Sequence, residues 1–126
     1  ASAVVVAKAN LEKVKSEGYM LGEVVFLVCD VNMFDKKVDV VIQNPPFGVK
    51  VRGNDRAFLK KAMEVADVLY SFHKSESDSF IKRFVEGEGY GVENYWEFDY
   101  PIKAMHDFHT RQICRFKVGC WRIVKN

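Results

Sequence analysis

Short apolar runs alternate with polar and glycine-containing stretches along most of the chain, which indicates alternating helices and strands. Apolar residues at helical spacing predict an amphipathic helix over residues 2–16 that ends near Gly18. Continuous apolar runs rich in β-branched residues predict buried strands at residues 23–29, 38–42 and 68–72. The order of these elements predicts an α/β fold.

Two further helices are expected on either side of the strand at residues 68–72. The first is capped by Asn54 or Asp55 and turns an apolar face inward. The second follows Ser75-x-x-Asp78, which resembles a capping box, and ends where three glycines occur. These glycines are Gly87, Gly89 and Gly91. They follow a helix and precede a strand, which is the wrong context for a nucleotide-binding glycine loop.

The last third of the chain predicts a pair of strands. Residues 92–100 alternate apolar or aromatic with acidic side chains, which is typical of a strand with one buried face. Residues 112–124 form the last strand, and their apolar parity changes at Gly119, which predicts a bulge or twist there. No repeat or linker separates the elements, so residues 1–126 are expected to form a single domain.

Composition narrows the class of protein only a little. Apolar residues make up 48% of the 126 residues, the net charge is +2, and no apolar run is long enough to span a bilayer. No signal-peptide pattern is present, and a chain that opens with Ala is expected to be a processed or excised piece. Cys29, Cys114 and Cys120 fall in apolar strand patterns, which predicts reduced, buried thiols and a cytoplasmic protein.

Metal and nucleophile chemistry are not indicated. His106, His109, Cys114 and Cys120 are residue types that bind zinc, but the chain has no C-x-x-C pair and both cysteines belong to a strand with bulky neighbours. We therefore predict no metal site. No Ser/His/Asp or Cys/His arrangement in the sequence predicts a nucleophile.

Two prolines end the strand at residues 38–42 and fix the backbone that follows. Asn44 precedes a proline and is held extended, and Pro45 is itself followed by Pro46. Ligands bind at the carboxyl edge of open α/β sheets, where these residues are expected. The Asn44 side-chain oxygen and the Pro45 carbonyl could together accept from an exocyclic NH2 group, and Phe47 could stack on a flat ring. A Pro-Pro turn that only ends a core strand is the alternative.

This segment resembles the Asn-Pro-Pro-Phe/Tyr motif of the S-adenosylmethionine-dependent N6-adenine methyltransferases. In that family the amino nitrogen of an extruded adenine attacks the methyl group of the cofactor, so the resemblance implies catalytic roles for Asn44, Pro45, Pro46 and Phe47. The rest of the chain resembles the archaeal and eukaryotic branch that methylates structural RNA, notably small-subunit ribosomal RNA. The residues that carry this second resemblance are Asp55-Arg56-x-Phe58-Leu59, Tyr70-Ser71-x-His73-Lys74, Pro101-Ile102 and Phe108-His109.

The resemblance implies a Rossmann-like class I methyltransferase sheet, mostly parallel with a C-terminal antiparallel pair and lacking its first two strands. By itself, the short link between residues 30 and 38 favours a hairpin. The family's glycine-rich cofactor turn is absent, and the cofactor contacts that the resemblance implies are Asp30, Val31 and Asn44. Asp30 would accept from the adenine amine of S-adenosylmethionine, and the alternative is that it caps the turn that follows. Unpaired strand edges would favour self-association or binding of the family's small zinc-binding activator subunit.

Basic residues gather on both sides of the proline motif, as contacts to phosphate require. One cluster lies at residues 50–61, and residues 103–126 contain six Lys or Arg against one acidic residue. Together with the resemblance, they imply RNA contacts by Lys50, Arg52, Arg56, His73, Lys74, His109 and Arg111. Solvated basic side chains on helix and strand faces are the alternative for each of them.

Two functions follow from these patterns. The first is an enzyme, the catalytic and target-binding part of an N6-adenine RNA methyltransferase that uses S-adenosylmethionine and acts on ribosomal RNA. It needs no general base, because the attacked nitrogen loses its proton after the cationic product has formed. The second is a cofactor-less domain of the same fold that binds nucleic acid or a partner subunit. Binding of S-adenosylmethionine would discriminate between the two.

Overall fold

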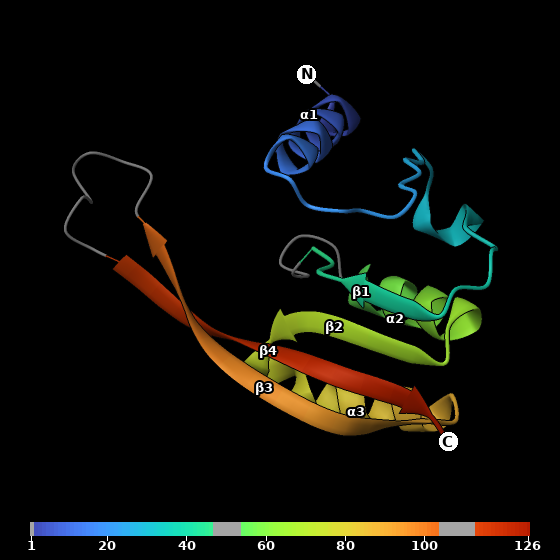
Figure 1. Cartoon of the computed structure of the whole chain (residues 1–126). Helices are drawn as coiled ribbons and strands as arrows, with labels where there is room; N and C mark the ends of the chain where they lie inside the picture. The colour runs from blue at the N-terminus through green and yellow to red at the C-terminus, as the bar shows by residue number, and fades with distance from the viewer. Residues whose placement is uncertain (1, 47–53, 104–112) are drawn as a thin grey trace. The chain divides into compact units, whose positions relative to one another are not determined.

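The computed structural model describes residues 2–46, 54–103 and 113–126, and Figure 1 shows the whole chain. The chain divides into two compact units, Ala1–Asp30 and Val31–Asn126. Each unit is described by itself below. The prediction of a single domain stays a prediction.

The first unit consists of one helix and an extended segment. Helix α1 spans Ala3–Ser16, and the Ser2 hydroxyl caps it by accepting from the Val5 N–H at 3.3 Å. Gly18 follows with φ +89°, a left-handed conformation that glycine adopts without strain, so the predicted helix and its end are confirmed. No residue of α1 is buried.

The predicted buried strand at residues 23–29 is wrong. These residues lie outside any helix or strand, and most of them are exposed, with Val28 at 84%. A strand is held by backbone hydrogen bonds to a neighbour, and no strand in the described part of the chain pairs with this run. Cys29 is correspondingly exposed, which corrects the prediction of a buried thiol. The hairpin suggested for the link after residue 30 is not formed either, because the short 3-10 helix η1, Val31–Met33, occupies it.

The second unit is built on a sheet whose order, within the described residues, is β1-β2-β4-β3. Its strands are β1, Val40–Gln43, β2, Val68–Lys74, β3, Tyr90–Lys103, and β4, Ile113–Lys125. Strand β2 pairs with β1 in parallel, and β4 is antiparallel to both β2 and β3. Three of these four strands therefore run in one direction and β4 runs against them. The predicted α/β fold class, mostly parallel with a C-terminal antiparallel pair, is confirmed.

Two helices cover one face of this sheet (Figure 1). Helix α2 spans Asn54–Val65, and α3 spans Asp78–Gly87 after the 3-10 turn η2, Ser75–Ser77. The core contains Leu59, Ala62, Met63, Leu69, Ile81, Val85, Tyr90, Trp121 and Ile123. Burying a large aliphatic side chain of this kind stabilises the fold by about 1.5–3 kcal/mol. The Tyr90 hydroxyl also lies 2.6 Å from the Met63 carbonyl oxygen, which ties β3 to α2.

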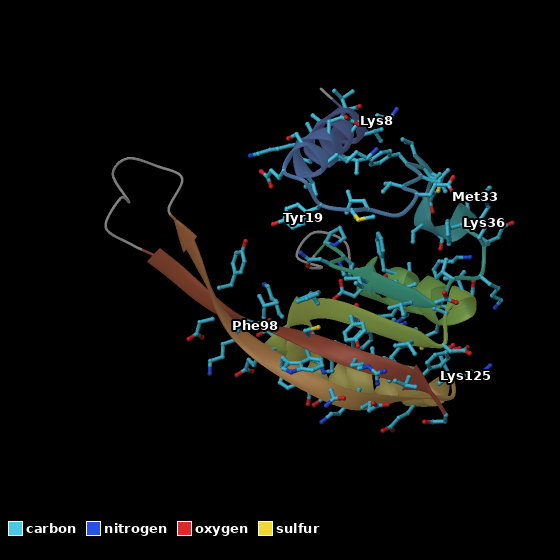
Figure 2. All side chains as sticks on the ribbon, viewed as in Figure 1. Lys8, Tyr19, Met33, Lys36, Phe98 and Lys125 are labelled. Carbon is cyan, nitrogen blue, oxygen red and sulfur yellow. The ribbon has the colours of Figure 1, made fainter. Side chains whose placement is uncertain are left out.

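The other face of the sheet carries exposed aromatic and aliphatic side chains. Strand β1 lies at the edge of the sheet, and Ile42 on this uncovered face is 74% exposed. The prediction that residues 38–42 form a buried strand is therefore wrong in its burial, although the strand exists. Trp96 and Phe98 of β3 are also exposed, and Figure 2 shows Phe98 with its side chain. The one-sided burial predicted for residues 92–100 is not observed.

The predicted capping box at Ser75 is also corrected. Helix α3 begins at Asp78, and its N-cap residue Ser77 makes no side-chain cap hydrogen bond. The Asp78 carboxylate instead accepts from the Trp121 indole N–H at 2.9 Å and pairs with Lys82 at 3.1 Å. The hydrogen bond from Trp121 is the main reason that the pKa of Asp78 is lowered.

The bulge expected at Gly119 lies on the neighbouring strand. The register shifts between Val92 and Asn94 of β3, whereas β4 continues through Gly119 without a break. A Cβ atom on Gly119 would lie 2.4 Å from Tyr95 Cε1 and 2.7 Å from Trp121 Cη2. The glycine is therefore required by the close approach of two aromatic rings and not by a bulge.

Candidate functional site

The segment that follows β1 leaves the sheet beside the polar end of β2. In the parallel register Gln43 is opposite Ser71, so the carboxyl ends of β1 and β2 share one edge. Asn44 and Pro46 are exposed at this edge, and Pro45 between them is buried. Phe47 and residues 50–53 of the predicted basic cluster lie outside the described residues.

Four polar side chains form a chain of contacts that begins at Gln43, the residue before Asn44. Gln43 Nε2 donates to Ser71 Oγ at 2.9 Å, and Ser71 Oγ lies 2.6 Å from His73 Nε2. His73 Nδ1 in turn lies 3.4 Å from a carboxylate oxygen, Oδ2, of Asp55 in the first turn of α2. Ser71 and His73 are both 0% exposed. We call these four residues the Gln43–Asp55 relay.

The relay contains a Ser-His-Asp sequence of contacts that was not predicted from the sequence. A fully buried Ser71 hydroxyl cannot reach a substrate, so the arrangement is not a nucleophile site. The signal available in the sequence was the spacing of Ser71 and His73, since residues two apart on a strand share a face. Their connection to Asp55 depends on how α2 packs against β2.

The electrostatics of the relay favour a neutral imidazole. Burial lowers the pKa of His73 below its usual value of 6.5, and the nearby Asp55 carboxylate opposes that shift without cancelling it. A neutral His73 has one N–H donor and one acceptor nitrogen, which suits a position between a hydroxyl and a carboxylate.

The residues predicted to contact RNA are placed differently from one another. Arg56 is exposed on α2, with its guanidinium carbon 5.7 Å from the ring centroids of both Phe80 and Phe84. Lys74 is half-buried at the end of β2, whereas His73 has no exposed surface, and we propose no RNA contact for His73. Lys50, Arg52, His109 and Arg111 lie outside the described residues.

A groove of about 390 Å³ opens between η1 and α2. It is lined by Asn32, Arg56, Ala57, Lys60, Lys61 and Glu64. Lys61 pairs with Glu64 at 2.9 Å, and this contact lowers the pKa of Glu64. Three of the six lining residues are cationic and one is acidic, and such a net positive surface is the kind that phosphate contacts use.

The residues predicted to hold S-adenosylmethionine belong to both units. Asp30 and Asn44 are exposed and carry oxygen acceptors that suit an amine, but Asp30 belongs to the first unit, and Val31 and Asn44 to the second. The described residues contain no glycine-rich turn between a strand and a helix that could hold the methionine end of the cofactor. They also contain no cluster of three metal-ligand side chains, and Cys120 is a buried free thiol.

No helix in the described part of the chain is long and apolar enough to cross a membrane.

Comparison with known proteins gives relatives named as rRNA methyltransferases. No family model matches the chain. The chain is 34% identical over 91 residues to the rRNA N(6)-adenosine-methyltransferase Mettl5 of Drosophila melanogaster, covering 71% of this chain and 43% of that protein. It is 32% identical over 102 residues to the corresponding protein of Danio rerio, covering 76% and 49%. The chain thus spans less than half the length of these curated relatives.

The fold is also similar to that of a solved structure. A Pyrococcus horikoshii protein described as a candidate RNA methyltransferase matches with a TM-score of 0.66 and 39% identity. The match covers 76% of this chain and 48% of that one. In both sequence and fold, the chain is therefore similar to about half the length of proteins named as RNA methyltransferases.

Proposed function

We propose that the chain supplies the target-base side of an RNA N6-adenine methyltransferase site. The observation that carries this proposal is the exposure of the Asn44 carboxamide at the carboxyl edge of a parallel strand pair, directly before a buried Pro45. The relatives named as rRNA N(6)-adenosine-methyltransferases support it. Small-subunit ribosomal RNA is the substrate that the resemblance implies.

In this proposal the chain's own residues orient the base. The Asn44 side-chain oxygen and the Pro45 carbonyl accept from the two hydrogens of the adenine amine, and Phe47 stacks on its ring. The amine lone pair is delocalised into the ring, so acceptors that favour a tetrahedral nitrogen stabilise the transition state more than the ground state. S-adenosylmethionine would supply the methyl group, with Asp30 and Val31 as contacts to its adenosyl end.

Extrusion of the adenine limits the choice of substrate. Flipping a base out of a duplex costs a few kcal/mol, so unpaired adenines are preferred. Arg56 and Lys74 lie on the same unit as Asn44 and would bind phosphate on either side of the flipped nucleotide. A small zinc-binding activator subunit on an exposed strand edge and a cytoplasmic location remain predictions from the resemblance.

The test is methyl transfer from labelled S-adenosylmethionine to an RNA with unpaired adenines. Asn44→Ala is expected to lower transfer by about 100-fold or more, as for loss of one transition-state hydrogen-bond partner, with an unchanged thermal unfolding curve. Asn94→Ala is the matched control, because Asn94 is also exposed but lies on β3. Asn44→Ala with wild-type turnover would refute the assigned role.

The same experiments also test the alternative function, a domain without a cofactor. A wild-type chain that binds the RNA but gives no heat with S-adenosylmethionine in calorimetry would instead be a nucleic-acid-binding or subunit-interface domain of the same fold.

A further inference from the structure

Several buried polar groups have no part in the proposed chemistry. Ser71 and His73 are both 0% exposed on the helix-covered face of β2. His73 Nδ1 and Asp55 Oδ1 are buried without a hydrogen-bond partner among the described residues. An unsatisfied buried polar group is unfavourable. Buried polar groups that interact with one another can specify a unique arrangement of the core.

The relay joins the two ends of the segment that contains the proposed base site. Gln43 is the last residue of β1 and directly precedes Asn44. Asp55 lies at the other end of that segment, in the first turn of α2. Both ends are therefore connected to the same strand, β2, through Ser71 and His73.

Only one arrangement of protons satisfies every contact in the relay. Gln43 Nε2 donates to Ser71 Oγ, so the Ser71 hydroxyl hydrogen is left to donate to His73 Nε2. His73 must then carry its proton on Nδ1, which faces the Asp55 carboxylate at 3.4 Å. With the proton on Nε2, Ser71 Oγ could still accept from both neighbours, but the Nδ1 lone pair would face the Asp55 carboxylate, which is repulsive.

We infer that the hydrogen bonds from Gln43 through Ser71 to His73, together with the charge of Asp55 facing His73 Nδ1, form a directional relay that positions Asn44, with His73 acting as the neutral Nδ1–H tautomer. This inference rests on the proposed function, for which it adds a positioning residue. His73 touches no substrate and acts through Gln43 and Asp55. The contact to Asp55 is the longest in the relay and the one most sensitive to a shift of α2.

The relay can be tested on the full chain without RNA or a methyl donor. Nitrogen-15 NMR of the histidine ring nitrogens is expected to show His73 as the neutral Nδ1–H tautomer at pH 7, assigned by its loss in His73→Gln. Ser71→Ala removes the donor to Nε2 but leaves Asp55 facing Nδ1, so the Nδ1–H tautomer is expected to remain while the Asn44 carboxamide signals shift. A His73 ring that is doubly protonated or carries its proton on Nε2 in the wild type overturns the inference, and so do unmoved Asn44 signals in Ser71→Ala.

A conservative pair of variants tests the other end of the relay. Asp55→Asn keeps an oxygen acceptor for Nδ1–H and is expected to preserve the tautomer, whereas Asp55→Ala is expected to lose it and to shift the Asn44 signals. Ile123→Val is the matched control, because Ile123 is fully buried on the same face of the sheet but is not part of the relay. It removes one buried methyl group and should leave both sets of signals unchanged. Equal signals in Asp55→Ala and the wild type would refute the role of Asp55.

Kinetics separate this inference from the proposed function. If the wild type transfers methyl groups, Ser71→Ala is expected to lower kcat by about 10-fold to 100-fold with KM for RNA unchanged, as for misplacement of a reacting group. Equal kcat in Ser71→Ala and wild type overturns the positioning role. If the wild type transfers none but shows the Nδ1–H tautomer and the coupled Asn44 signals, the proposed enzyme fails and the relay stands.

Discussion

Substituting Gly119 by alanine tests whether this glycine serves aromatic packing. The added Cβ atom would lie 2.4 Å from Tyr95 Cε1 and 2.7 and 2.8 Å from two ring carbons of Trp121. Contacts below 3.0 Å require movement, and Trp121 is fully buried with its indole N–H bound to Asp78. Tyr95 is partly exposed, but its ring lies 4.8 Å from that of Trp121, so one ring cannot move without the other. Overpacking of this kind costs about 1–3 kcal/mol.

A smaller effect acts in the opposite direction. Alanine restricts the unfolded chain more than glycine does and stabilises by about 0.4–1 kcal/mol where the native backbone accepts it. The φ angle of Gly119 is not positive, so this gain applies, and we expect a net destabilisation of about 1–2 kcal/mol. For a unit of this size each kcal/mol lowers Tm by about 4–8 °C.

Thermal and urea unfolding followed by circular dichroism measure this effect. Gly119→Ala is expected to lower Tm and the urea midpoint without changing the m-value. Gly91→Ala is the control, because its Cβ would meet only the end of the Asn126 side chain, at 3.1 Å. If Gly119→Ala were as stable as the wild type, the aromatic contact would not be what requires glycine here.

Two further predictions concern titration and reactivity. Because burial holds the pKa of His73 below 6.5, the unfolded chain binds this proton more tightly. The free energy of unfolding should therefore rise with pH up to about 6.5 and then level off, with the rise reduced in His73→Gln, and urea midpoints that fall across this range would contradict it. Exposed Cys29 should react with a thiol reagent in the native protein, whereas Cys120, whose thiol pKa burial raises, should react only on unfolding. Equal rates would contradict this assignment.

Local sequence patterns were sufficient to predict the helices and strands that are stabilised by residues nearby in the chain or by a paired strand. The helix at Ala3–Ser16 follows from apolar spacing, a serine cap and a glycine end, all within 18 residues. The strand predicted at residues 68–72 is observed at Val68–Lys74. It is buried on one face because α2 packs against it, and β4 pairs with it. Residues 23–29 have the same apolar composition but no partner in the described part of the chain, and they do not form a strand. An apolar run therefore predicts a strand only where something pairs with it.

Long-range contacts account for the features that the sequence did not predict. The parity change at Gly119 was interpreted as a bulge, whereas it arises because both faces of β4 are buried there, Cys120 on one and Trp121 on the other. Asp78 was interpreted as part of a capping box, but its partner is Trp121, 43 residues away. Such pairings depend on strand order, which no local pattern contains.

The candidate site combines both kinds of information. The order Asn44-Pro45-Pro46 is fixed by covalent structure, so its extended backbone could be predicted. The direction in which Asn44 points depends instead on the register of β1, a four-residue edge strand that buries little surface. A slip of one residue would exchange the two faces of β1 and turn Asn44 the other way.

Val41 packs against the core, and polar contacts at both ends of β1 add to what fixes its register. The Val38 N–H donates to the Val65 carbonyl at 2.9 Å before the strand, and Gln43 donates to Ser71 at its end. Neither contact survives a slip of one residue, because Gln43 would then face away from Ser71. One side chain that helps to specify the register is thus also the first member of the relay. Gln43 and Ser71 therefore help to set the register of β1 and also orient Asn44.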